Sequence, residues 1–169
     1  MKILSKVAMG AAALTLLVGC SSLKQVEYKE FHEKAVAAWK DVPYTKATVN
    51  GHMKQTVQGQ EYAEEFKNVE VKLSAGSVDA AWAAELATKI IAGDEDAAKA
   101  YEAAIMVATN ATVVPESKDY KYYVGGGFKL EMTEDDAKAT MTWDKYAMLT
   151  GLTETGEGLD VKLTVKYSK

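Results

Sequence analysis

The chain has 169 residues, of which 20 are Lys or Arg and 24 are Asp or Glu, so its formal net charge is −4. Residues 1–19 hold two of the lysines and no acidic residue, which leaves 18 basic against 24 acidic residues, a net charge of −6, from residue 20 onward. This negative balance argues against nucleic acid as a partner and against charge-driven binding to anionic lipid headgroups. The remaining 150 residues suit a single domain with a sizeable core.

Residues 1–19 have the layout of a secretory signal peptide. Lys2 and Lys6 form a short positive region, an uncharged apolar run follows over residues 7–18, and the small Gly19 precedes Cys20, the single cysteine. The apolar run is too short to span a bilayer comfortably. We therefore predict that residues 1–19 direct export and are then cleaved off.

The four residues Leu17-Val18-Gly19-Cys20 resemble the lipobox of bacterial lipoproteins. The resemblance implies that lipid is attached to the Cys20 sulfur, that cleavage falls between Gly19 and Cys20, and that Cys20 becomes the first mature residue. Two acyl chains on one residue are enough for stable anchoring. We expect a protein held by lipid outside the cytoplasm, at the cell surface or the periplasmic face, with residues 20–23 as a lipidated tether and 24–169 as one domain.

The first half of this domain is predicted to be a helix, a hairpin and two further helices. Apolar residues recur at spacings of three and four over residues 23–40, and Pro43 disfavours helix beyond them. Alternation predicts strands over residues 44–57 and 61–73, and a bulge near residues 67–68 would bring the two halves of the second strand onto one face.

The two helices after the hairpin are indicated by apolar spacing and by capping residues. Ser77 is expected to cap the first helix, and Gly93 to end it. Asp94 is expected to cap the second, Ala-rich helix, which is predicted to run to about Thr109.

The last third of the chain is predicted to form three strands. Residues 120–132 alternate strictly, and the three glycines at 125–127 are interpreted as a bend within this strand. Alternation continues over 137–149 and 159–167, with a Gly-rich loop over 151–158. The predicted fold is α+β: an antiparallel sheet of about five strands, in the order α-β-β-α-α-β-β-β, packed against helices.

No residue pattern indicates catalysis, a resident metal or a cofactor. His32 and His52 have no His or Cys at ligand spacing, and the GxSxG motif of hydrolases is absent. The acidic runs at 94–96 and 134–136 are interpreted as a helix start and a turn, because their spacing does not match a calcium loop. With Cys20 lipidated, the folded part has no cysteine for a disulfide or a metal. We expect a protein that is not an enzyme.

Aromatic and methionine side chains are the remaining candidates for binding, because most fall on faces predicted to point inward. They either fill the core or line a cavity between a curved sheet and its helices that holds an apolar ligand. Methionines would suit an adaptable wall of such a cavity. The residues of this predicted apolar pocket are Trp39, Met53, Trp82, Tyr101, Tyr122, Phe128, Met141 and Trp143.

A lipobox combined with an antiparallel sheet curved over helices looks like the LolA/LppX class of lipid- and lipoprotein-carrying domains. The resemblance is one of architecture, and the half-barrel carriers of that class have more strands than the five predicted. It implies a membrane-anchored binding domain for a small apolar molecule or a lipid. The alternative is an envelope-structural or protein-interaction lipoprotein with a filled core, no ligand and an envelope protein as its partner.

The lipobox makes a direct prediction about Cys20. The substitution Cys20→Ser should abolish fatty-acid labelling and leave the signal peptide attached, because the acylated sulfur would be missing. Metabolic labelling with palmitate, followed by mass determination of the purified chain, measures both effects. Palmitate that stays on the Cys20→Ser variant would refute the assignment.

Overall fold

The structure is a computed structural model that describes residues 22–169. The predicted signal peptide, the lipobox with Gly19 and Cys20, and the first two tether residues lie outside the described residues. The nine strands found in the described part are β1 (Lys24–Val26), β2 (Lys46–Val57), β3 (Gln60–Ser74), β4 (Ser77–Val78), β5 (Tyr120–Val124), β6 (Phe128–Glu134), β7 (Ala137–Trp143), β8 (Leu149–Gly156) and β9 (Leu159–Ser168). The helices are α1 (Tyr28–Trp39), α2 (Ala80–Ile91), α3 (Glu95–Val107) and the short 3₁₀ turn η4 (Ala111–Val113).

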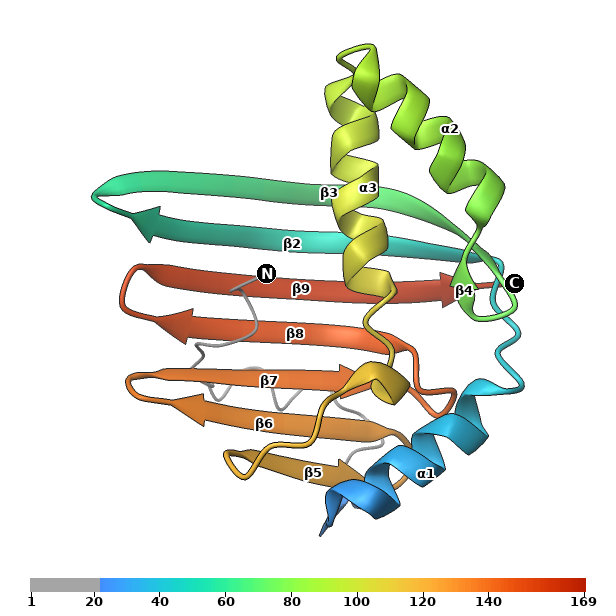
Figure 1. Cartoon of the computed structure of the whole chain (residues 1–169), viewed down its shortest axis with the longest axis vertical. Coiled ribbons are helices and arrows are strands. Elements are labelled where there is room, and N and C mark those ends of the chain that lie inside the picture. Colours follow the sequence, from blue (N-terminus) through green and yellow to red (C-terminus); the bar gives the residue numbers. More distant parts are fainter. Residues whose placement is uncertain (1–21) are drawn as a thin grey trace.

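The described strands form one antiparallel sheet in the order β1-β5-β6-β7-β8-β9-β2-β3-β4. Figure 1 shows the sheet as a single layer, with α1 lying across its β5 side and α3 crossing β3 and β2. The α2 helix packs mainly against α3 and leans out beyond β3 (Figure 1). The tips of the β2–β3 hairpin extend past α3.

The predicted sheet of about five strands is wrong, and nine strands replace it. The predicted strand over 120–132 is two strands, and the predicted Gly-rich loop over 151–158 is wrong, because most of it belongs to β8 (Leu149–Gly156). The glycines at 125–127 do not bend one strand but connect β5 to β6, with Val124 opposite Phe128 and the Gly125 amide donating to the Gly127 carbonyl at 3.0 Å. Strict alternation hid this connection, because a three-residue turn between residues 124 and 128 leaves the even-numbered side chains on the same face.

The second missed connection separates β7 from β8. Asp144 organises it: its carboxylate accepts from the amides of Tyr146 at 2.9 Å and Met148 at 3.1 Å, and its own amide donates to the Met148 carbonyl at 2.9 Å. Ala147 takes a left-handed backbone conformation with φ of 62°. A turn closed by an aspartate side chain needs neither Gly nor Pro, so the usual turn residues do not mark it.

Two short edge strands account for the rest of the difference. Lys24–Val26, predicted to begin the first helix, instead pairs with β5, and α1 begins only at Tyr28. Ser77, predicted to cap the next helix, instead belongs to β4, where it pairs with Ser74 of β3. The cap of α2 is Asp79, whose carboxylate accepts from the Trp82 amide at 2.8 Å.

The bulge predicted near residues 67–68 is confirmed. Val49 lies opposite Val69 and Gly51 opposite Phe66, so Lys67 and Asn68 together face the single residue Asn50. Asn68 has a left-handed backbone with φ of 51°, and its amide donates to the Asn50 side-chain oxygen at 2.8 Å. The asparagine side chain thus takes over a hydrogen bond that the ladder loses at the bulge.

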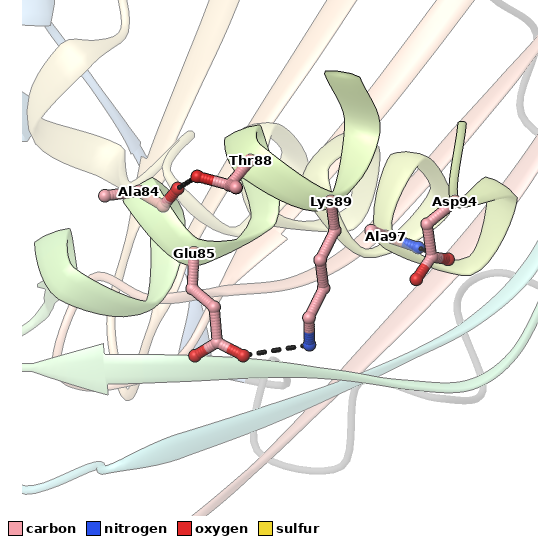
Figure 2. Close-up of polar contacts among 6 residues, drawn as sticks. All are labelled: Ala84, Glu85, Thr88, Lys89, Asp94 and Ala97. Atoms are coloured by element: carbon pink, nitrogen blue, oxygen red, sulfur yellow. Dashed lines mark hydrogen bonds and ion pairs between the residues drawn. The ribbon is translucent and has the colours of Figure 1, made fainter. Parts of the chain in front are cut away.

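The α2–α3 hairpin projects from the sheet, and Figure 2 shows local polar contacts within α2 and at the start of α3. Asp94 caps α3 as predicted, accepting from the Ala97 amide at 2.9 Å. On α2, Glu85 and Lys89 form an exposed ion pair at 2.8 Å, which lowers the pKa of Glu85 and raises that of Lys89 through their hydrogen bond. Such exposed pairs contribute little to stability.

The main core lies between α1 and the β5–β8 part of the sheet. The fully buried Phe31 of α1 has its ring centroid 5.3 Å from that of Tyr122, 5.6 Å from Phe128 and 6.0 Å from Trp143. The Trp143 indole donates to the Thr109 carbonyl at 2.8 Å, so the one polar atom of its ring is satisfied. Within residues 22–169 no helix is long and apolar enough to cross a membrane.

The β5–β6 turn predicts the effect of a small substitution. A Cβ on Gly127 would lie 2.5 Å from the carbonyl oxygen of Trp143, a backbone atom of the neighbouring strand, so Gly127→Ala must displace one strand. We expect a loss of about 1–3 kcal/mol in the free energy of unfolding, measured by urea denaturation.

The matched control is Gly59→Asn at the β2–β3 turn. A Cβ there meets nothing within 4 Å, and asparagine tolerates the left-handed φ of 79°. This variant should stay within about 0.5 kcal/mol of the parent chain. Equal unfolding midpoints for both variants would contradict the close approach at Gly127.

Candidate functional site

A groove of about 550 Å³ lies between α3 and the β2–β3 hairpin. We call it the α3 groove. It is formed where the C-terminal half of α3 passes over the hairpin, whose strands run on beyond the helix (Figure 1). Its lining residues are Met53 and Gln55 from β2, Glu61, Tyr62, Ala63 and Glu64 from β3, and Glu102, Ile105 and Met106 from α3.

The bulge in β3 determines which side chains reach the groove. Register pairs place Tyr62 opposite Gln55 and Glu64 opposite Met53. The same face of β3 continues on the other side of the bulge with Val69, opposite Val49. Without the extra residue at the bulge, the period of two would turn Tyr62 and Glu64 to the opposite face of the sheet.

One wall of the α3 groove is apolar and adaptable. Met53 on the sheet and Ile105 and Met106 on α3 are partly buried, and Tyr62 is 54% exposed at the rim. The Tyr62 hydroxyl donates to the Gln60 side-chain oxygen at 3.1 Å, which holds the ring along the hairpin. Unbranched thioether side chains can repack around ligands of different shape.

Carboxylates form the other part of the lining. Glu64 is a partner of Lys99, with Oε1 and Nζ 3.5 Å apart, and both side chains are about one-third exposed. Glu102, one helical turn after Lys99, lies close enough to Glu64 for their carboxyl groups to interact. Glu61 also borders the groove, but its side chain alternates to the opposite face of β3 from Glu64. No Lys or Arg is among the lining residues.

The pKa of Glu102 is raised above its ordinary value, first because the carboxyl is partly desolvated and then because Glu64 repels its charge and shares a hydrogen bond with it. Lys99 acts in the opposite direction but does not offset these effects. The α3 groove therefore places two carboxyl groups so close together that they repel each other when both are ionised.

The residues of the predicted apolar pocket do not come together in one cavity. Met53 alone among them lines the α3 groove. Four others belong to the packed core, where each is at most 4% exposed: Tyr122, Phe128, Met141 and Trp143. The Tyr122 hydroxyl is also fixed within the core, since it donates to the Pro115 carbonyl at 2.8 Å and accepts from the Ser117 amide at 2.9 Å.

The remaining three predicted residues lie away from the groove. Trp39, the last residue of α1, donates its indole N–H to the Gly76 carbonyl at 3.2 Å. Trp82 packs against the core from the first turn of α2. Tyr101 is 44% exposed on α3, although the sequence pattern placed it inward.

Sequence reasoning missed most of the groove. It missed Tyr62, Glu64, Glu102, Ile105 and Met106 as site residues. The sequence carried one signal for part of the site. Tyr62 and Phe66 have even numbers, whereas the apolar residues Val69 and Val71 have odd numbers, so a regular strand could not place all of them on one face. The bulge that brings them onto one face also turns Glu64 toward α3. Glu102 had no such signal, because an acidic residue on a helix surface is usually solvated.

Comparison of the chain with protein-family models, curated proteins and solved structures finds no match. Among the described residues, no group of three His, Cys, Asp or Glu side chains is placed to hold a metal ion.

The raised pKa of Glu102 predicts a pH-dependent stability. Glu64 faces this carboxyl from β3, and Lys99 acts on it from its own helix. Between the unfolded-state pKa and the raised folded-state pKa, the folded chain binds more protons, so this group makes stability fall as the pH rises. Glu102→Gln should therefore stabilise the chain by about 0.5 kcal/mol near neutral pH, a small value because Glu102 is only partly buried.

Thermal unfolding at several pH values tests this expectation. The gain from Glu102→Gln should disappear near pH 3, where the carboxyl of the parent chain is protonated in both states. A variant that is less stable than the parent at neutral pH would show that the attraction of Lys99 dominates at Glu102.

Proposed function

We propose that the protein is a lipid-anchored lipoprotein outside the cytoplasm, not an enzyme, and that its domain binds a small apolar molecule or a lipid. The observation that carries the binding proposal is the α3 groove, with its wall of Met53, Ile105 and Met106. Its volume of about 550 Å³ lies within the range of roughly 300–1,000 Å³ typical of ligand sites. The anchoring proposal rests on the Leu17–Cys20 lipobox.

The size of the sheet supports the same proposal. The sequence predicted about five strands for this chain, which is fewer than the LolA/LppX-like carriers have. The described residues contain nine strands in one antiparallel sheet with helices on it, a strand number nearer to that of the half-barrel carriers. This likeness concerns architecture, and the choice of ligand must come from the groove itself.

A second candidate function is favoured by the filled core. Tyr122, Phe128 and Trp143 pack around Phe31 and do not line the α3 groove. Such a core suits an envelope-structural or protein-interaction lipoprotein that works through its outer surface and binds no ligand. Direct measurement of binding to the α3 groove separates the two candidates.

The test uses the full chain with Cys20→Ser, which removes the proposed acylation site and keeps every described residue. An uncharged naphthylamine dye that fluoresces in apolar sites reports binding. Ile105→Asp places a carboxylate in the apolar wall of the groove and should weaken dye binding roughly tenfold.

The matched control is Ile91→Asp. Ile91 is 89% exposed at the end of α2, so the same chemical change there leaves the groove intact and should leave dye affinity unchanged. Circular dichroism of both variants verifies that they fold. Failure of the dye to bind the parent chain, or equal binding by the parent and Ile105→Asp, would favour the interaction lipoprotein.

A further inference from the structure

The charge of the α3 groove is one-sided. Glu64 and Glu102 contribute carboxylates to its lining, and no Lys or Arg is among the lining residues. Lys99, which acts on Glu102 from the same helix, is already engaged by Glu64 at 3.5 Å. An anionic headgroup, such as a carboxylate or a phosphate, would meet two like charges and a single lysine that already has a partner.

The Glu64–Glu102 pair points to a ligand that carries positive charge. Partial desolvation and the neighbouring carboxylate oppose ionisation of Glu102, as its raised pKa reflects. A cation seated between the two carboxylates would offset this repulsion and replace the water lost from them. The arrangement therefore favours binding of a positively charged ligand over binding of a neutral ligand.

The surroundings of the pair favour an organic cation rather than a metal ion. A bound Ca²⁺ takes six to eight oxygen ligands, whereas no three acidic or His side chains in the described residues converge on one point. An ammonium group needs only a few acceptors and tolerates an apolar neighbourhood. The exposed face of Tyr62 at the rim is a further favourable neighbour for such a group.

The apolar wall lies beside these charges in the same groove. Met53 stands opposite Glu64 on the neighbouring strand, and Met106 follows Glu102 by one helical turn on α3. A molecule bound here would thus contact carboxylates with one end and methionine and isoleucine side chains with the other.

We propose that the α3 groove selects an amphiphile with a cationic, ammonium-type headgroup, whose charge is held by Glu64 and Glu102 and whose apolar tail lies against Met53, Ile105 and Met106. This proposal rests on the proposed binding function and names its ligand class.

The experiment compares three probes with the same tail: decylammonium, decanol and decanoate. Titration calorimetry on the full chain with Cys20→Ser, near pH 8 and at low salt, measures their affinities below their micelle concentrations. Decylammonium should bind roughly tenfold more tightly than decanoate, with decanol between them. The ratio should shrink as salt is added, because screening weakens interactions between exposed charges.

Substitution of the carboxylate separates charge from shape. Glu102→Gln keeps the side-chain size and removes the charge, so it should reduce the preference for decylammonium over decanoate several-fold. The matched control is Glu85→Gln on α2, where the carboxylate pairs with Lys89 outside the groove (Figure 2). This variant should keep the preference of the parent chain.

Each remaining outcome decides against a specific part of the proposal. Equal affinities for the two charged probes, tighter binding of decanoate, or an unchanged preference in Glu102→Gln would overturn the choice of a cationic ligand while leaving an apolar binding site. If none of the three probes binds, the proposed binding function itself fails. Equal losses of preference in Glu102→Gln and Glu85→Gln would show a general effect of net charge, and would also overturn the proposal.

Discussion

The candidate site depends on one extra residue in β3. Side chains on a strand alternate between faces, so a single inserted residue exchanges the faces of everything beyond it. At Lys67 and Asn68 this exchange places Phe66 on the same face as Val69. Glu64 and Tyr62, which alternate with the same period as Phe66, lie on that face too. The Asn50 side chain stabilises the bulge by accepting from the Asn68 amide at 2.8 Å. Without the bulge, α3 would contact a different set of hairpin side chains.

The α3 groove also places charges where they oppose stability. Glu102 and Glu64 could both lie in water on a helix or an edge strand, yet they approach each other beside methionine side chains. Functional sites commonly retain such unfavourable arrangements, because a ligand relieves them when it binds. Two core residues show the opposite: Tyr122 and Trp143 direct their polar atoms to backbone carbonyls and leave no such cost.

Alternation in the sequence predicts most strands, but it fails where a connection preserves the alternation. The β2–β3 hairpin and β9 agree closely with their predicted bounds, as does the Asp94 cap of α3. The turn at Asp144 is invisible to a search for Gly and Pro, because an aspartate carboxylate closes it. Edge strands of two or three residues, such as β1, are too short to show any period.

The groove was harder to predict than the strands because it is a property of packing. The apolar spacing of α3 indicates a buried side, but it does not specify that Ile105 and Met106 would stand over Met53. That juxtaposition follows from where α3 crosses the hairpin, which depends on tertiary contacts. The aromatic residues chosen from the sequence are instead those with the largest area to bury, and several of them fill the core.

The strand order sets the distance between the proposed anchor and the groove. β1 and β3 are separated by seven strand-to-strand steps, each of about 4.8 Å, which place them roughly 34 Å apart. Lys24, the first residue of β1, follows Cys20 by four residues, a reach of only about 14 Å. If Cys20 is anchored as proposed and the sheet stands on its β1 edge, the groove is held well clear of the membrane. A ligand taken up from that membrane would then require the sheet to lie down on the bilayer.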